Sequence, residues 1–333
     1  MRGASHRVSF DDNAACAIVF GQHHLNLARI EQKIPVTIVT RGNEVLIQGD
    51  RDADVHAAAA VLEALHAKAQ RGLVIDRAEV DAALRMAGAG ERPAAQHVQI
   101  RTEGRPVSPR SLNQAAYVRA LETLELVFAT GPAGTGKTYL AVAQGVSFLK
   151  QRRVERLILS RPAVEAGERL GFLPGDLKEK VDPYLRPLYD ALQDMLTEGR
   201  LATRIENGQI EIAPLAYMRG RTLSNAFVIL DEAQNTSPAQ MKMFLTRLGE
   251  NSRMVVTGDP SQTDLPPGTS SGLSDALARL TGIEGIGMVT FDRGDIVRHP
   301  LVTEIIEAYE RGDKAAATPE PETRGRPNRA AST

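Results

Sequence analysis

The residues best suited to chemistry form an eight-residue string between two apolar stretches. It reads Gly131-Pro132-Ala133-Gly134-Thr135-Gly136-Lys137-Thr138 and fits the pattern G-x-x-x-x-G-K-[ST] throughout. Glycines in such a string let backbone N–H groups turn inward around phosphates at a helix N-terminus. We expect Lys137 to reach the β- and γ-phosphates of a nucleotide, and the Thr138 hydroxyl to ligate Mg²⁺. The alternative is a glycine-rich turn followed by a chance Lys-Thr pair.

The residues around the string favour the phosphate-binding interpretation. The apolar run 126–129 precedes it, and a helical pattern of apolar residues begins at Tyr139. A strand, a glycine loop and a helix in that order are the context in which a P-loop works.

A pair of carboxylates follows a second apolar strand pattern. Residues 227–230 are Phe-Val-Ile-Leu, and Asp231 and Glu232 come directly after them. Ligands of open α/β sheets bind at the carboxyl ends of the strands. We therefore expect Asp231 to hold Mg²⁺, directly or through water, and Glu232 to orient and deprotonate the attacking water. The alternative is that the pair caps the following helix.

Two glutamines complete the set of expected site residues. Gln262 follows a third short strand pattern at 254–257, and we expect it to sense the γ-phosphate or position the water. Gln114 lies upstream of the glycine string, and its amide can pair with an adenine edge through one donor and one acceptor. The alternatives are an exposed turn residue for Gln262 and a helix-start residue for Gln114.

These side chains need a sheet to bring them together. Apolar strand patterns lie at 126–130, 157–160, 226–230, 254–257 and 286–290, with helical patterns between them. Strands that alternate with helices predict an α/β fold, with a mostly parallel sheet covered by helices on both faces.

The composition is that of a globular protein and sets limits on its function. Of 333 residues, 24% are charged and 42% hydrophobic, and the net charge of -1 gives no global field that would attract nucleic acid. The one cysteine, Cys16, excludes a disulfide framework and a thiolate zinc site, and we expect it to be a buried small hydrophobe. No apolar stretch reaches the ~18 residues of a membrane span. With Asp11 and Asp12 near the start, the sequence predicts a cytoplasmic protein without membrane contact.

The chain divides by composition into four segments. Residues 1–87 alternate strand and helix patterns, 88–111 form a Pro- and Gly-rich linker with one short strand at 98–100, and 112–312 form the P-loop domain. Residues 313–333 lack large apolar side chains, so we expect a disordered tail.

The first segment predicts a small α/β domain. Its pattern is a strand at 17–20, a loop, a short helix, strands at 35–39 and 44–49, and a helix at 53–70. The order resembles a KH-type RNA-binding domain, whose GXXG loop clamps about four nucleotides. Here the loop is Gly21-Gln22-His23-His24, so the second glycine is missing. A domain used for assembly or partner docking is the alternative.

The motifs together resemble the PhoH family of P-loop ATPases, which is related to the superfamily-one helicase motor. Besides the glycine string, the segments that carry the resemblance are 160–168, 170–176, 217–222, 231–235 and 257–262. The resemblance covers about residues 105–310. It implies a RecA-like fold and an ATPase that uses ATP and Mg²⁺ and acts on RNA, in many cases beside an endoribonuclease of rRNA maturation. Only one motor-type domain is present, whereas a helicase of that superfamily has two.

Hydrolysis of this kind needs a cation near the γ-phosphate. The arginines that could supply it are Arg161, Arg247, Arg293 and Arg298. Arg298 matches the position that the resemblance marks for a finger, and a neighbouring subunit could provide it. The sequence thus predicts a homo-oligomer, a hexamer by resemblance to ring-forming P-loop ATPases. The glycine- and proline-rich loop 161–176 either couples the ATP state to RNA or is purely structural.

Two main functions remain open at this point. The first is an ATP-hydrolysing enzyme associated with RNA, which the Asp231-Glu232 pair favours. The second is a nucleotide-dependent regulator or scaffold that controls a partner nuclease with little turnover of its own. A kinase is a weaker third option, since no acceptor pocket can be recognised in the sequence.

Overall fold

The computed structural model describes residues 3–88, 98–162, 177–266, 268–297, 302 and 305. By its internal contacts the chain divides into two units, Met1–Ile296 and Val297–Thr333, and the first unit contains two separate β-sheets. Within the described residues, every helix is too short or too polar to cross a bilayer.

The larger sheet has six parallel strands. They are β4 (Leu126–Thr130), β5 (Arg156–Arg161), β6 (Ile210–Pro214), β7 (Ala226–Leu230), β8 (Arg253–Gly258) and β9 (Ile286–Thr290). Their order across the sheet is β6-β5-β7-β8-β4-β9, and each neighbouring pair is parallel. The predicted parallel α/β sheet is confirmed.

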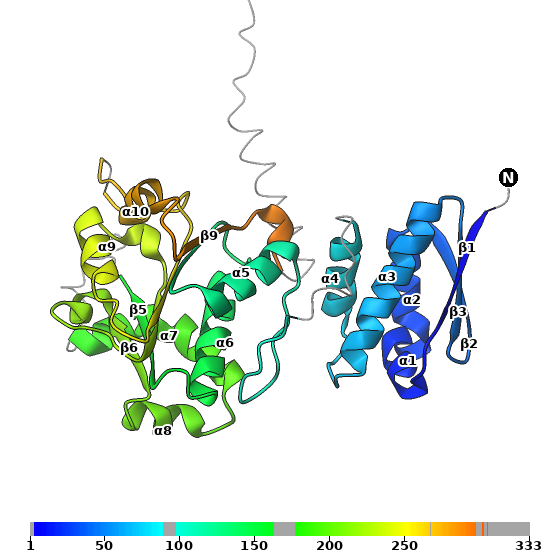
Figure 1. The fold of residues 1–333 in the computed structure, drawn as a ribbon, viewed down its shortest axis with the longest axis horizontal. Coiled ribbons are helices and arrows are strands. Elements are labelled where there is room, and N and C mark those ends of the chain that lie inside the picture. Colours follow the sequence, from blue (N-terminus) through cyan, green and yellow to red (C-terminus); the bar gives the residue numbers. More distant parts are fainter. Residues whose placement is uncertain are drawn as a thin grey trace, which may run out of the picture. The chain divides into compact units, whose positions relative to one another are not determined.

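Helices cover both faces of this sheet (Figure 1). They are α5 (Leu112–Thr123), α6 (Lys137–Lys150), α7 (Leu177–Met195), α8 (Arg200–Glu206), α9 (Pro238–Leu245) and α10 (Gly272–Leu280). Alternate strand residues point to opposite cores. Val127 and Ala129 of β4 pack with α5, α6 and α7, whereas Leu126 and Phe128 pack with α9 and α10. Because both faces are buried, the central strands β4 and β7 are apolar along almost their whole length.

All five predicted strands of this sheet are present, and one further strand was not predicted. Strand β6 lies at an edge and pairs only with β5. Its sequence is Ile-Glu-Ile-Ala-Pro, and only Ile210 and Ala213 of these five residues are buried. A run this short that ends in proline gives a weak strand signal. In the predicted linker, the strand at 98–100 is reduced to one bridge between Ile100 and Val107.

The smaller sheet belongs to the N-terminal segment. Its elements are β1 (Ala4–Ser9), α1 (Asn13–Phe20), η1 (Gln22–His24), α2 (Leu25–Lys33), β2 (Val36–Arg41), β3 (Glu44–Gly49), α3 (Asp52–Ala69) and α4 (Arg77–Gly88). The three strands are antiparallel in the order β1-β3-β2 and have a hydrophobic core of their own. Cys16 is buried in that core, as predicted, and burial together with the nearby Asp12 raises the pKa of its thiol.

The predicted strand at 17–20 is wrong, because these residues form the last turns of α1. The Asp12 carboxylate accepts hydrogen bonds from Ala14 N and Ala15 N and so caps the helix. Buried Cys16, Val19 and Phe20 lie on one helical face. Periodicity alone cannot distinguish a short apolar run of this kind from a buried strand.

Candidate nucleotide-binding site

The glycine string connects the end of β4 to the start of α6, as the sequence predicts. Gly131 has a φ of +134°, and a Cβ added to it would lie 2.3 Å from the backbone oxygen of Phe291. Gly136, with a φ of +82°, is the N-cap residue of α6. Positive φ angles favour glycine, so both positions need it. The string also carries Pro132, Ala133, Gly134 and Thr135, and its end presents the N-terminus of a 14-residue helix.

Lys137 folds back over this loop. Its Nζ donates to the carbonyl oxygens of Gly131 at 2.6 Å and Pro132 at 2.8 Å, and the residue is 8% exposed. Burial lowers the pKa of Lys137, while the negative charges of Asp259, Asp231 and Glu232 partly oppose this shift. Three carboxylates thus act on one buried ammonium group at the mouth of the loop.

Thr138 and Asp231 meet across the sheet although 93 positions separate them in sequence. Thr138 Oγ1 donates to Asp231 Oδ1 at 2.6 Å, and Thr257 Oγ1 donates to the same oxygen at 2.7 Å. Mg²⁺ prefers hard oxygen ligands such as these hydroxyl and carboxylate groups. The two residues predicted to hold the metal therefore lie together and fit it chemically.

Glu232 follows Asp231 in a left-handed conformation, with a φ of +51°. Arg161 Nη2 lies 2.9 Å from its Oε1, and Gln234 Nε2 donates to its Oε2 at 2.6 Å. The Glu232 side chain remains 38% exposed. A non-glycine residue in this region of φ is strained, and such strain gathers at functional sites. The two contacts fix the direction of a carboxylate that solvent can still reach.

Gln234 connects the Glu232 loop to the loop after β8. Its Oε1 accepts a hydrogen bond from Asp259 N at 3.1 Å, and the residue is 2% exposed. Asp259 is also buried, and its Oδ2 has no hydrogen-bond partner among the described residues. The sequence indicated no role for Gln234, Asp259 or Thr257. Their place at or just after the ends of predicted strands was one available signal, and their place in the segments 231–235 and 257–262, which carry the family resemblance, was another.

The two glutamines predicted for base reading and phosphate sensing lie in different settings. Gln114 is buried on α5, where its Oε1 accepts from Arg110 N at 2.6 Å and its Nε2 donates to Thr135 O at 3.0 Å. Its amide therefore supports the glycine loop directly. Gln262 is exposed, and its side chain makes no hydrogen bond within the part of the chain that the structure describes.

The four arginines considered as catalytic cations differ in their surroundings. Arg161 pairs with Glu232, and Arg247 donates to the carbonyl oxygens of Met243 and Arg221 at 3.1 Å each. Arg293 belongs to η6 (Arg293–Asp295) and has interactions of its own. Arg298 and residues 163–176 of the predicted coupling loop lie outside the described residues.

Comparison with known proteins agrees with this arrangement. The family described as PhoH-like protein matches residues 106–310. A PhoH-like protein of Bacillus subtilis is 51% identical over 298 residues, which cover 88% of this chain and 93% of that protein. A PhoH-like protein of Synechocystis is 46% identical over 87% of this chain and 90% of its own length. Protein PhoH of Escherichia coli is 51% identical over 61% of this chain and 58% of its own length.

A search of solved structures aligns the Pif1 helicase from Candida albicans with a TM-score of 0.31 and 12% identity, over 60% of this chain and 42% of that one. The α/β fold is defined by the strand order of the parallel sheet and by the glycine loop between β4 and α6. Together these describe a nucleotide-binding site of the P-loop type.

Proposed function

The chain belongs to the family of PhoH-like proteins, and on that premise we propose that it binds ATP with Mg²⁺ and hydrolyses it. The observation that carries this proposal is the 2.6 Å contact between Thr138 Oγ1 and Asp231 Oδ1. It joins the end of the glycine loop to the carboxylate after β7, and these are the two sides of a P-loop NTPase site.

Each residue of the site has a separate task in this proposal. Lys137 and the backbone N–H groups of the loop hold the β- and γ-phosphates, and Thr138 and Asp231 hold Mg²⁺. The metal neutralises charge on the phosphate oxygens. Glu232 orients a water molecule and accepts its proton, because its carboxylate is fixed in direction and open to solvent. Gln262 senses the γ-phosphate from the loop after β8.

The rate of phosphate release from ATP tests this proposal. We expect Lys137→Ala to lose nucleotide binding or turnover while the protein stays folded. We expect Glu232→Gln to bind ATP·Mg²⁺ but to hydrolyse it about 10²–10⁴-fold more slowly, because the amide keeps the shape and cannot take the proton. Normal turnover by a folded Glu232→Gln variant would make Glu232 a capping residue and reject it as the base.

RNA is the proposed partner of this activity, and an endoribonuclease of rRNA maturation is the proposed second partner. The family resemblance supports both, and we propose in addition that the protein is cytoplasmic. The loop 21–24 adds a structural argument, because residues 22–24 are exposed between α1 and α2 and His24 has a φ of +61°. His24 thus adopts the left-handed backbone that a second glycine would favour. Phosphate release with and without structured RNA tests the link to RNA.

A second function, that of a nucleotide-dependent regulator with little turnover, is favoured by one observation. Arg161 forms an ion pair with Oε1 of Glu232, which is one of the two carboxylate oxygens of the proposed base. A carboxylate held in an ion pair is less free to accept a proton from water. A wild-type rate that stays at the Glu232→Gln level, with tight ATP binding, would select this function.

A further inference from the structure

A cavity of about 490 Å³ lies at the opposite end of α6 from the glycine loop. Lys150 and Arg152 come from the end of that helix and the turn after it, Arg200 and Arg204 from α8, and Glu103 from the segment before α5. At 1.5 Å per residue, the 14 residues of α6 separate it from the glycine loop by about 21 Å. We call it the α8 cavity. It is distinct from the nucleotide site.

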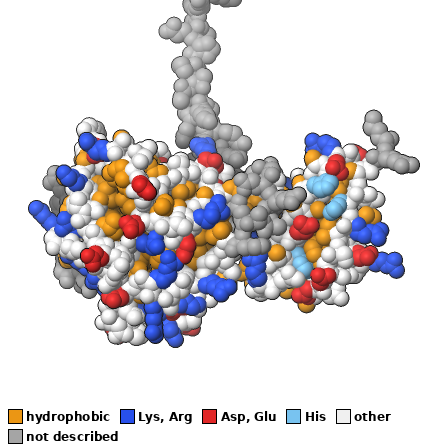
Figure 2. Space-filling view, viewed as in Figure 1, with side chains coloured by type: hydrophobic (Ala, Val, Ile, Leu, Met, Phe, Trp, Pro, Cys, Tyr) orange, Lys and Arg blue, Asp and Glu red, His pale blue; other side chains and the backbone are white. Residues whose placement is uncertain are grey.

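The α8 cavity is strongly basic. Four cationic side chains line it, and among its described lining residues Glu103 is the one carboxylate. Lys and Arg side chains are visible at this lower end of the domain (Figure 2). In the described residues, Lys150 and Arg152 form no ion pair, and Lys150 Nζ donates to Thr102 O at 2.6 Å. Most of the positive charge is therefore not neutralised by the protein.

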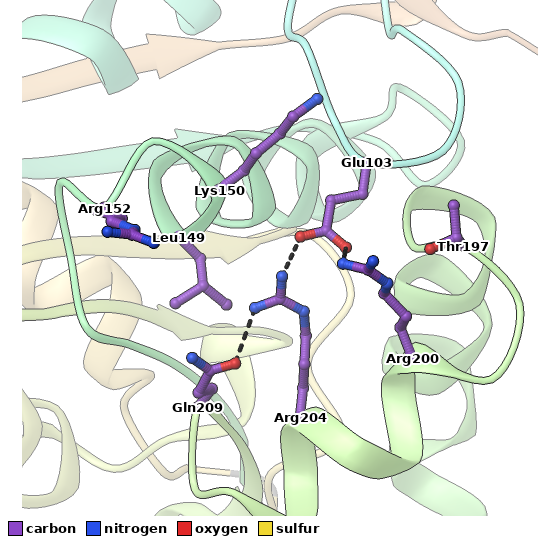
Figure 3. A pocket seen from close by; sticks show the side chains of 8 residues that line it. All are labelled: Glu103, Leu149, Lys150, Arg152, Thr197, Arg200, Arg204 and Gln209. Atoms are coloured by element: carbon purple, nitrogen blue, oxygen red, sulfur yellow. Dashed lines mark hydrogen bonds and ion pairs between the residues drawn. The ribbon is translucent and has the colours of Figure 1, made fainter.

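Glu103 holds two of the arginines in place. Both Arg200 and Arg204 point from α8 toward its carboxylate (Figure 3). Arg204 pairs with Glu103 Oε1 and donates to Gln209 Oε1 at 3.0 Å, while Arg200 Nη1 lies 3.8 Å from Glu103 Oε2. The Arg204 side chain is 14% exposed, and its Nε has no hydrogen-bond partner among the described residues. Arg204 is thus a largely buried cation at the base of the cavity, and Arg200, whose side chain is 64% exposed, lies at its rim.

The turn that supplies Arg152 is costly to keep. Arg152 has a φ of +59°, and Arg153 N donates back to Phe148 O at 2.9 Å, as in a Schellman motif at the end of a helix. That left-handed backbone conformation favours glycine, and a residue other than glycine in it costs of order 1–3 kcal/mol of conformational strain. This chain therefore has a cation at a position where glycine would fit the backbone better.

We propose that the α8 cavity is a second phosphate-binding site, for ligands that present more than one phosphate charge. Guanidinium groups bind phosphate oxygens through paired donors, and an ammonium group adds a point charge. Leu149 is the one apolar side chain among the described lining residues, and no aromatic side chain is among them. Base recognition in single strands uses aromatic stacking, so the site recognises phosphates and not bases. This proposal goes beyond ATP hydrolysis and does not depend on it.

Two probes distinguish the sources of such phosphates. Pyrophosphate, followed by calorimetry, represents a soluble phosphate compound, and a fluorescein-labelled oligouridine, followed by anisotropy, represents an RNA backbone. Both are measured on the full chain carrying Lys137→Ala, so that the glycine loop contributes little. The test variant adds Arg152→Ala and Arg200→Ala. The control adds Lys242→Ala and Arg279→Ala, which remove the same charge from exposed positions on α9 and α10.

We expect the test variant to bind one or both probes about tenfold or more weakly than the control, since contacts to charged groups are worth about 1.5–3 kcal/mol. If the ligand is RNA, its salt slope should fall by about 1.4 for two lost phosphate contacts. Loss of oligouridine binding assigns the site to an RNA backbone, and loss of pyrophosphate binding alone assigns it to a soluble compound. Equal binding of both probes by test and control variants would overturn the proposal.

A change at Glu103 supplies a readout of opposite sign. Glu103→Gln removes the negative charge from the cavity and keeps an amide oxygen for Arg204. We expect the Glu103→Gln protein to bind the same probe several-fold more tightly than the Lys137→Ala parent. The Lys242→Ala/Arg279→Ala control should bind that probe as the parent does. Loss of folding cannot produce tighter binding. Thermal unfolding of each variant shows that the comparison is between folded proteins.

Discussion

At the scale of single residues, Gln234 is the side chain whose role the structure defines most sharply. It joins Glu232 Oε2 to Asp259 N, so it couples the proposed base to the loop that follows β8. We predict that Gln234→Ala lowers kcat about 10- to 100-fold and leaves KM nearly unchanged, because a small misplacement of a base is enough for such a loss. Steady-state kinetics measure both constants.

Gln240→Ala is the matched control for this prediction. Gln240 is exposed and completes the capping box of α9 with Ser237. Its loss removes one hydrogen bond, so it should cost about 0.5–1.5 kcal/mol of stability and leave kcat intact. A fall in kcat that is equal in the two variants would show that Gln234 acts through stability and not through the base.

The buried ammonium of Lys137 predicts a proton linkage. Burial lowers its pKa in the free protein, and a phosphate beside it raises that pKa again. Between the lowered pKa and the ordinary Lys value of about 10.4, nucleotide binding should therefore take up protons. Affinity should be full below the lowered pKa and fall as the pH rises through it.

Calorimetry in two buffers of different ionisation enthalpy measures this uptake. Lys137→Arg is the control, since a guanidinium stays charged throughout and should show no uptake wherever the variant still binds. Identical binding heats in the two buffers at alkaline pH would contradict a lowered Lys137 pKa.

The sequence predicted the motif residues of the site, but it did not predict the side chains that contact them. Lys137, Thr138 and Asp231 follow from spacing within one loop or at one strand end, and the structure brings them together. The contacts of Gln234 with Asp259 and of Arg161 with Glu232 join separate loops. Those contacts exist because β5, β7 and β8 are neighbours, and strand order is not encoded in any local pattern.

At the scale of elements, helix α6 depends on a glycine in its interior. A Cβ added to Gly145 would lie 2.6 Å from Leu157 Cδ1 and 3.0 Å from Phe227 Cδ1, which are side chains of β5 and β7. Alanine usually stabilises a helix relative to glycine. Here we predict that Gly145→Ala destabilises the fold by about 1–3 kcal/mol through overpacking, measured by denaturant unfolding.

A double-mutant cycle checks the cause. In a Leu157→Ala background the added methyl has room, so Gly145→Ala should cost much less there than in the wild type. An equal loss of unfolding free energy in both backgrounds would mean that the added methyl group does not clash with Leu157.

The sequence predicted some helices and strands correctly and missed or misassigned others. The strands of the large sheet that carry the site are apolar over most of their length because helices cover both faces, and their patterns were clear. Strand β6 is short, ends in proline and lies at an edge of the sheet, and α1 buries one face of an apolar run that resembles a strand. Their burial depends on packing partners far away in sequence.

At the scale of the whole molecule, the site raises the question of a neighbouring subunit. Of the arginines considered, Arg161 and Arg247 are engaged within the chain. We predict an active homo-oligomer, a hexamer by family resemblance, in which Arg298 of one subunit serves the nucleotide of the next. A finger supplied in trans is worth roughly 10³–10⁵ in rate.

Mixing two inactive variants tests the trans arrangement. Lys137→Ala and Arg298→Ala subunits should restore part of the activity together, because some sites combine an intact glycine loop with an intact Arg298. No recovery in mixtures shown to exchange subunits would reject it. A fully active monomer in light scattering would do the same.

The place of β4 in the large sheet has a consequence for how the chain is made. This strand leads into the glycine loop and is the first of the six in sequence, yet its two neighbours, β8 and β9, are the last two. A ribosome therefore releases the phosphate-binding loop long before the strands that seat it. The loop cannot be seated until β8, which ends at Gly258, has emerged, and a chain that ends before β8 carries the complete motif with neither strand that pairs with β4.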